Sequence, residues 1–268
     1  MVMLVPGDHW ATLGAGFLFT VNPYYNFWGG SILGVFFLID TLITKRMASQ
    51  VGKEDQHDKS SVPTFKEMIG VIKYPSLWFL IILTIFTWTF YTVFDQQMFP
   101  QFYTSLFKSE ARGENFYGIL NSLEVFCEAI MMVIVPFVMK KIGVKKTLLL
   151  GIFVMFVRIG LCGVVRSPVE VSFVKMLHSI EVPLFMLSIF RYFTLHFDTK
   201  LSATLYMVGF QIAAQIGQVI LSTPLGTIRD NIGYRHTFLI ISLNVFGAFI
   251  YAFFVLKKDN VDVYGDPL

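Results

Sequence analysis

Charged residues are scarce in this sequence. Only 15% of its 268 residues are Asp, Glu, Lys or Arg, whereas 55% are hydrophobic and Phe alone occurs 29 times. Soluble domains carry about 25% charged residues. A soluble fold has no use for so much apolar surface, but lipid-facing helices do, because they are apolar on the outside as well as the inside. The composition excludes a soluble globular enzyme and predicts an all-α membrane protein.

Cysteine and the common enzyme motifs are equally scarce. The two cysteines, Cys127 and Cys162, lie in apolar runs, where we expect packing rather than a disulfide or a metal site. The sequence has no HExxH, no GxSxG and no Cys/His spacing suited to zinc. Its net charge of +3 is too small and scattered for nucleic acid. We therefore expect no enzyme activity, no metal, no cofactor and no nucleic-acid partner.

Apolar runs and their breaks predict about eight membrane-spanning helices. A single long polar stretch, residues 48–73, is too hydrophilic to lie in lipid and separates two spans from six. The expected spans cover residues 11–21, 27–43, 77–107, 116–139, 147–165, 169–193, 201–228 and 234–256.

The basic residues predict the orientation of these spans. Of the 21 Lys and Arg residues, 14 fall on the side that holds the long polar stretch and the C-terminus, and five on the other side. Because basic residues collect on the cytoplasmic side, this bias places the C-terminus in the cytoplasm. The last two basic residues, Arg158 and Lys175, lie within helices.

Charged and titratable residues inside the expected spans are the most informative feature. A charge at the bilayer centre costs about 2.5–3.5 kcal/mol on insertion scales, so such residues face the bundle interior and find partners. An inert bundle needs none of them. This chain has seven: Asp95, Glu124, Glu128, Arg158, Lys175, His178 and Glu181.

The densest group is Lys175, His178 and Glu181, spaced i, i+3 and i+6. These positions fall within about 120° of one another on a helix. Proton coupling requires a carboxyl group that gains and loses a cationic neighbour as helices move. Here the cationic neighbour of Glu181 would be Arg158. We expect Pro183 to bend this helix just beyond Glu181.

A purely structural role stays open for these charges. Asp95 with Lys175, and Glu181 with Arg158, could be ion pairs that only hold helices together. Glu124 and Glu128 form an i, i+4 like-charge pair, which favours a shared proton or a water-filled cavity. The alternative is that one of the two reaches the membrane interface.

The sequence resembles the lactose, sucrose, raffinose and melibiose permeases, the oligosaccharide:proton symporters of the major facilitator superfamily. The resemblance covers roughly residues 10–257 and rests on specific stretches in the right order. They are YTVFDQQ at 91–97, KIG at 141–143, VRI at 157–159, KMLHSIEVP at 175–183, and residues 197–205 with SAT at 202–204.

The resemblance implies a role for each residue of the group. Glu181 matches the carboxyl that carries the coupled proton, Arg158 the arginine that drives its deprotonation, and His178 the histidine that links sugar and proton sites. Asp95 and Lys175 match an intramembrane charge pair. The expected sugar-binding residues are His178, Asn121, Glu124 and Glu128.

Departures from the family pattern narrow these expectations. Thr92 and Ala214 stand where the lactose permease has an aspartate and its partner lysine, so both charges are lost together and no orphan charge remains. Val125 occupies the position at which the lactose permease has a carboxylate on its eighth helix. Glu128, one turn further on, resembles the pattern of the sucrose and raffinose permeases. This pattern argues against a strict lactose specificity.

The resemblance also predicts how the chain is organised. Four helices of the family are missing before the first span, and residues 1–9 fit the family poorly. We expect residues 1–46 to be a two-helix remnant of the N-terminal half, 47–73 the central cytoplasmic loop, 74–258 the C-terminal six-helix half, and 259–268 a cytoplasmic tail.

The expected function follows from this organisation. We expect an integral protein of the cell membrane that couples inward proton flow to uptake of a di- or trisaccharide, with the sugar, the proton and the lipid bilayer as its partners. The alternative is a truncated membrane fragment that does not transport. The sequence leaves the oligomeric state open.

Overall fold

The computed structural model describes residues 23–51, 73–197 and 199–260. The first expected span, residues 11–21, lies outside these ranges, as do residues 52–72 of the polar stretch. The chain divides into two units, Met1–Thr64 and Phe65–Leu268. Each unit is described by itself.

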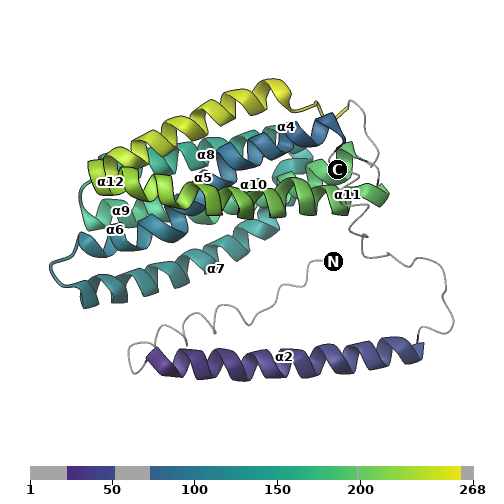
Figure 1. Ribbon diagram of the computed structural model, residues 1–268, viewed down its shortest axis with the longest axis horizontal. Helices are drawn as coiled ribbons and strands as arrows, with labels where there is room; N and C mark the ends of the chain where they lie inside the picture. Colours follow the sequence, from purple (N-terminus) through teal and green to yellow (C-terminus); the bar gives the residue numbers. More distant parts are fainter. Residues whose placement is uncertain (1–22, 52–72, 198, 261–268) are drawn as a thin grey trace. The chain divides into compact units, whose positions relative to one another are not determined.

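The described part of the first unit is one helix, α2, which covers Pro23–Val51 (Figure 1). It contains the expected span 27–43, and its apolar stretch runs over Trp28–Thr44. The helix continues to Val51, beyond the expected end of the span at residue 43, because no helix-breaking residue occurs before Val51.

The described part of the second unit consists of helices joined by short turns (Figure 1). Three of its segments, labelled η, are π-helical. The order is α4 (Pro75–Thr84), η1 (Ile85–Thr89), α5 (Phe90–Thr92), η2 (Val93–Met98), α6 (Phe99–Ser105), α7 (Glu110–Ile142), α8 (Val144–Val164), α9 (Pro168–Lys175), α10 (His178–His196), α11 (Thr199–Tyr206), η3 (Met207–Ile212) and α12 (Ala213–Val255).

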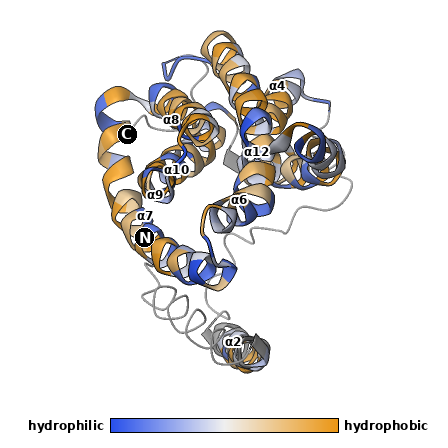
Figure 2. Cartoon of the chain, turned by 90° about the vertical axis from the view of Figure 1, so that its left-hand side faces the viewer, coloured by the Kyte–Doolittle hydropathy of each residue, from blue (hydrophilic) through white to orange (hydrophobic). Residues whose placement is uncertain are grey.

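Five stretches of the described chain are long and apolar enough to cross a membrane, namely Pro75–Ser105, Glu110–Ile142, Val144–Val164, Pro168–His196 and Leu201–Val255. Apolar residues cover outward-facing as well as inward-facing sides of the helices (Figure 2). The prediction of an all-α membrane fold is therefore confirmed. The expected spans 201–228 and 234–256 share the fifth stretch, which folds back on itself within α12 (Figure 1).

Two Ile-Gly pairs mark the sharpest changes of direction. Gly143, between α7 and α8, has φ 92° and ψ 163°, and Gly233, inside α12, has φ 81° and ψ 165°. Only glycine adopts this backbone conformation readily, because it has no Cβ. Gly143 also makes room for Asp259, whose side chain would collide with a Cβ at that position.

Asp259 uses this room to cap α8. Its Oδ1 accepts a hydrogen bond from the backbone N–H of Lys145 (3.0 Å), in the first turn of the helix. A carboxylate there satisfies a free N–H and interacts favourably with the helix dipole. The Lys145 ammonium group in turn donates to the carbonyl oxygens of Phe253 (2.9 Å) and Leu256 (2.5 Å) at the end of α12.

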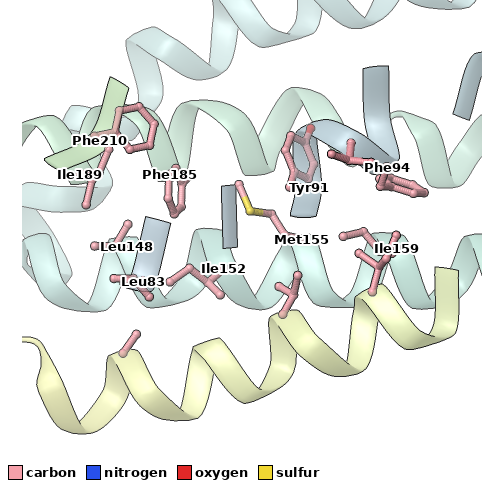
Figure 3. Close-up of a cluster of buried hydrophobic side chains, with 14 of the residues drawn as sticks. Leu83, Tyr91, Phe94, Leu148, Ile152, Met155, Ile159, Phe185, Ile189 and Phe210 are labelled. Carbon is pink, nitrogen blue, oxygen red and sulfur yellow. The ribbon is translucent and has the colours of Figure 1, made fainter. Parts of the chain in front are cut away.

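Helix α8 packs mainly against α10 and α12. Leu148, Ile152, Met155 and Ile159 recur at the spacing of one helix face and are fully buried (Figure 3). Arg158 follows Met155 by one turn, so the apolar core and the central charge share the same helix. The apolar packing therefore decides where the charge sits.

We expect alanine at the two positive-φ glycines to lower thermal stability by different amounts. Gly233→Ala adds backbone strain alone, which costs about 1–3 kcal/mol. Gly143→Ala adds the same strain and displaces Asp259, so its melting temperature in detergent should fall further. Gly118→Ala, with open space around the added carbon inside α7, should leave the melting temperature unchanged or raise it. Equal losses for the two strained variants would contradict the capping role of Asp259.

Candidate functional site

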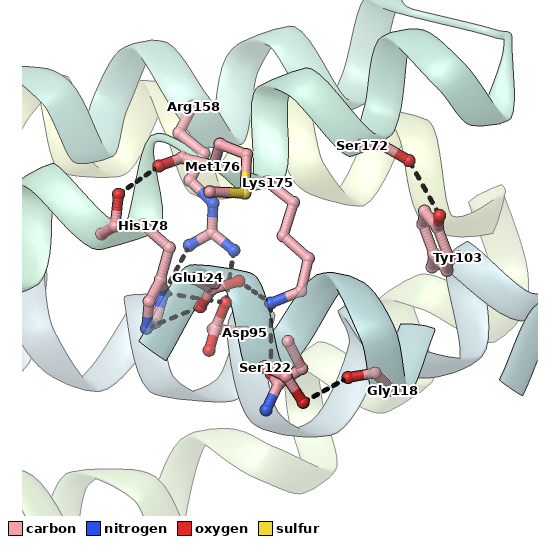
Figure 4. Close-up of polar contacts among 12 residues, drawn as sticks. Asp95, Tyr103, Gly118, Ser122, Glu124, Arg158, Ser172, Lys175, Met176 and His178 are labelled. Atoms are coloured by element: carbon pink, nitrogen blue, oxygen red, sulfur yellow. Dashed lines mark hydrogen bonds and ion pairs between the residues drawn. The ribbon is translucent and has the colours of Figure 1, made fainter. Parts of the chain in front are cut away.

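The site is built around the Arg158 guanidinium, whose side chain is 0% exposed. Its Nη2 lies 2.5 Å from Oδ1 of Asp95, which comes from η2 (Figure 4). Its Nη1 lies 2.6 Å from Oε1 of Glu181, on the first turn of α10. One cation thus joins carboxylates from two other membrane-spanning stretches.

Aromatic rings enclose the same guanidinium. The rings of Tyr91, Phe94 and Phe99 lie with their centroids 5.7, 5.3 and 5.4 Å from its central carbon. Ring faces are attractive to a cation and keep water away from it. The Arg158–Glu181 pair is desolvated, with both side chains 0% exposed, so its geometry matters more than that of a surface pair.

His178 is held between Arg158 and α7. Its Nδ1 forms a hydrogen bond with the Tyr91 hydroxyl and lies 3.2 Å from Arg158 Nη1, and its Nε2 lies 3.2 Å from Oε1 of Glu124. A guanidinium nitrogen can only donate, so Nδ1 is the acceptor. A neutral imidazole in this position would carry its proton on Nε2, the nitrogen that faces the Glu124 carboxylate.

Lys175 and Glu124 form a second buried ion pair, with side chains 2% and 3% exposed (Figure 4). The Lys175 ammonium also donates to Asn121 Oδ1 at 3.4 Å. Because Glu124 contacts both Lys175 and His178, it connects the ammonium group to the imidazole. The six charged or titratable groups from Glu181 to Lys175 form one continuous network.

The structure differs from the expected pairing of Asp95 with Lys175. Among the described residues, Asp95 pairs with Arg158 and Lys175 pairs with Glu124. The planar guanidinium has two terminal nitrogens and so reaches two carboxylates at once, whereas an ammonium group is a single point of charge. Lys175 therefore pairs with Glu124, the carboxylate on α7.

Glu124 and Glu128 lie in different surroundings although they share a helix face. Glu124 is buried against Lys175 and His178, whereas Glu128 is half-buried and has no hydrogen bond or ion pair within the described chain. The two carboxylates therefore do not act as a symmetric pair. Glu128 is the one with oxygens available to another partner.

The bend near Glu181 lies before it rather than after it. The helix is interrupted at Met176 and Leu177, between α9 and α10, and Pro183 lies inside α10. Pro183 has no N–H for the Ser179 carbonyl, and the adjustment falls in the preceding turn, where tighter bonds such as Ser179 N–H to Met176 O (3.2 Å) form. The interruption ends the Lys175 helix and starts the helix that carries His178 and Glu181.

Sequence patterns did not single out Tyr91 as a site residue. Its hydroxyl contacts His178 and accepts a hydrogen bond from Arg158 Nη1 at 3.1 Å, and its side chain is 2% exposed. The one available signal was its place at the start of the YTVFDQQ stretch, four residues before Asp95. That spacing crosses into the π-helical segment η2, which changes the face on which Asp95 lies.

A family model described as LacY proton/sugar symporter matches residues 8–265. The chain belongs to this family. It therefore has the all-α membrane fold of the major facilitator superfamily and is an integral membrane protein.

Several permeases are similar to this chain. The sucrose permease of Escherichia coli is 40% identical over 249 residues, which are 93% of this chain and 59% of that protein. The melibiose permease of Enterobacter cloacae is 32% identical over 245 residues, which are 91% and 57%. The raffinose permease of Escherichia coli is 32% identical over 246 residues, which are 91% and 58%. The chain thus spans less than two thirds of the length of these relatives.

Thr92 and Ala214, the two positions where we expected a charge pair to be lost, make uncharged contacts. Thr92 and Ala214 are 6% and 4% exposed. The Thr92 hydroxyl donates to Thr89 O (2.9 Å), and the Thr89 hydroxyl donates to Ala214 O (3.5 Å). These bonds satisfy the hydroxyls and leave no buried charge to be paired.

The Lys175–Glu124 pair makes a prediction about stability. Lys175→Met strands a buried carboxylate, so we expect the free energy of unfolding in detergent to fall by about 3–5 kcal/mol. Adding Glu124→Gln should restore most of this loss, whereas adding Asp95→Asn should not, because Asp95 pairs with Arg158.

Lys258→Met, at an exposed lysine, is the control and should leave stability unchanged. Recovery with Asp95→Asn instead of Glu124→Gln would mean that Lys175 is paired with Asp95 after all.

Proposed function

We propose that this chain works in proton-coupled symport of a di- or trisaccharide across the cell membrane, with Glu181 as the carboxyl that carries the proton. The observation that supports this role is the asymmetry of its two oxygens. Oε1 bonds to Arg158, while the buried Oε2 has no hydrogen-bond partner among the described residues. A proton on Oε2 would make it a donor and would weaken the hold of Arg158 on Glu181.

The charges of the network support one proton as the unit of coupling. The network contains two cations, Arg158 and Lys175, and the imidazole of His178. It also contains three carboxylates, Asp95, Glu124 and Glu181. With the carboxylates ionised and the imidazole neutral, the network carries one negative charge. One added proton makes it neutral, and a neutral network crosses between conformations in a membrane at the lowest electrostatic cost.

The sugar is proposed to bind beside this network along α7. Asn121, Glu124 and Glu128 lie on that helix, and His178 faces it. Carboxylates and an amide are suited to sugar hydroxyls, and Glu128 has no partner within the described chain. Because His178 and Glu124 touch each other, a hydroxyl that bonds to either would act on the network that holds Glu181. The similarity to a sucrose permease makes sucrose the first sugar to test.

The proposed orientation places the C-terminus in the cytoplasm. Lys140 and Lys141 end α7, and Lys145 and Lys146 begin α8. Lys257 and Lys258 follow α12. Lys145 bonds to the end of α12, so these basic residues lie at one end of the bundle. Basic residues favour the cytoplasmic side.

The alternative is a membrane fragment that does not transport. It is supported by the chain covering only 57–59% of the length of the three relatives. Transporters of this superfamily bind substrate between two six-helix halves. A half without its complement would hold the network but could not alternate access.

Uptake of labelled sugar by cells expressing the chain separates these possibilities. One proton per sugar supplies about 2.3 kcal/mol per 100 mV, which is about 50-fold accumulation. We expect sucrose or a related sugar to accumulate and a protonophore to abolish the accumulation. Absence of uptake of sucrose, raffinose, melibiose and lactose, with the protein present in the membrane, would support the fragment.

Glu181→Gln tests the proton role in a version completed to the length of the relatives. We expect accumulation to fall to the external concentration, while exchange of internal for external sugar persists, because the variant is fixed in the neutral form. Glu170→Gln is the matched control, since that exposed carboxyl only caps α9 and its amide can still do so. Full protonophore-sensitive accumulation by Glu181→Gln would contradict the role of Glu181 as the proton carrier.

A further inference from the structure

The start of α4 and the end of α12 lie at the same end of the second unit (Figure 1). Together with the end of α10 they enclose a pocket of about 300 Å³, a size at the lower end of pockets that hold small molecules. Its wall is mainly apolar and includes Phe79, Leu80, Phe197, Val255 and Leu256.

The pocket is separate from the network around Arg158. Tyr192, which lines the pocket from α10, follows Glu181 by 11 residues, about 16 Å along that helix. None of the residues that line the pocket belongs to the network. A ligand in this pocket would therefore not contact the groups proposed to carry the proton or to bind the sugar.

Polar groups also line the pocket. Ser76, on the first turn of α4, and Lys257, just after α12, contribute to it, as do Tyr192 and His196 from α10. The Tyr192 hydroxyl accepts a hydrogen bond from the Lys257 backbone N–H (2.9 Å), and the Tyr192 and His196 rings lie 4.4 Å apart between centroids. The backbone at Lys257 is thus tied to α10, which holds this part of the wall in place.

Aromatic side chains place the pocket at the depth of the lipid head groups. Tyr74 and Trp78, at the start of α4, are 47% and 49% exposed. Tyr and Trp collect at the membrane–water interfaces, where the ring meets hydrocarbon and its polar atom meets the head groups. Phe79, which lines the pocket, is 48% exposed, so the pocket opens to the outer surface of the helices.

Basic residues surround the same pocket. Lys257 lines it, Lys258 follows in the chain, and Lys73 precedes α4 by two residues. Asp259, the next residue, is bonded to the backbone N–H of Lys145 on α8. Near a membrane surface each lysine strengthens the attraction to anionic lipid about fivefold. Helix α4 also begins here without a side-chain cap, and the positive end of its dipole favours an anion.

The apolar wall and the basic rim together fit one class of ligand. A sugar would leave most of its hydroxyls facing apolar side chains, where they find no hydrogen-bond partner. A small inorganic anion would use the lysines but not the apolar wall. A phospholipid uses both, because its phosphate lies at head-group depth and its glycerol backbone and first acyl carbons lie directly below.

We propose that this pocket binds an anionic phospholipid, with the phosphate beside Lys257 and Ser76 and the upper part of one acyl chain against Leu80, Phe197 and Val255. The volume accommodates that part of the lipid, and the remaining chain atoms lie in the bilayer. The proposal goes beyond the proposed transport and needs only the membrane fold, so it holds or fails whether or not the chain moves a sugar. A lipid bound there joins the ends of three membrane-spanning stretches.

Native mass spectrometry of the purified full chain in detergent tests the proposal, because it counts the lipid molecules bound to each chain. The probes are phosphatidylglycerol, which is anionic, phosphatidylethanolamine with the same acyl chains, which is zwitterionic, and inorganic phosphate. Lys257→Gln removes the charge and keeps the backbone bond to Tyr192, and Ser76→Leu fills the pocket. Lys258→Gln and Ser105→Leu are the matched controls, at exposed residues that do not line the pocket.

We expect the unsubstituted chain to bind one phosphatidylglycerol at least about tenfold more tightly than phosphatidylethanolamine. Lys257→Gln should weaken this binding about fivefold. Lys258→Gln should weaken it less than about twofold in about 0.15 M salt, which screens exposed charges. Phosphatidylglycerol should raise the melting temperature of the unsubstituted chain and of Ser105→Leu, but not that of Ser76→Leu.

Equal weakening by Lys257→Gln and Lys258→Gln would overturn the proposal, because it would indicate a diffuse attraction to the surface. Unchanged affinity in Ser76→Leu would place the lipid elsewhere, and equal binding of the two lipids would remove the role of the charge. Displacement of the lipid by inorganic phosphate would mean that the site takes a soluble anion instead. If Ser76→Leu does not fold, Val255→Trp fills the same pocket from α12 and carries the same expectation.

Discussion

The rest of the structure depends on placing one guanidinium where water does not reach it. A buried cation in a membrane bundle is costly unless its partners are close and well aligned. Arg158 meets this condition through Asp95 and Glu181, at 2.5 and 2.6 Å, and through surrounding aromatic rings. Three membrane-spanning stretches must converge to supply these groups, so the helix packing and the charge network cannot be varied independently.

Local irregularities of the helices make this convergence possible. The π-helical segment η2 carries Asp95, and the interruption between α9 and α10 separates Lys175 from His178 and Glu181. A regular helix through either region would direct these side chains differently relative to their partners on the neighbouring helices. Such departures from ideal helices store little energy when neighbouring helices restore the contacts, and they are typical of functional sites.

Polar groups occur in this fold under two different conditions. The network around Arg158 is buried except at Asp95 and His178, whose side chains are 16% exposed, and each of its charged groups has a partner of opposite charge. The glutamines of η2, α6 and the first part of α12 are neutral and mostly exposed, and some bond to neighbouring side chains, as Gln97 does to Ser222. At Thr92 and Ala214, where the resemblance led us to expect a lost charge pair, threonine hydroxyls bond to backbone carbonyls.

The sequence by itself determined the class of the protein, the membrane-spanning stretches that the structure describes, and six charged or titratable residues that the structure brings into contact. Hydrophobic runs and buried charges are local signals, and helices in lipid must satisfy their own backbone bonds, so these features are readable without a fold. Only the tertiary structure decided that Arg158 forms an ion pair with Asp95 and that Lys175 forms one with Glu124. It also decided that the helix is interrupted before Glu181, between α9 and α10. Pairing depends on distances between helices far apart in sequence, and a π turn rotates side chains in a way that no residue count reveals.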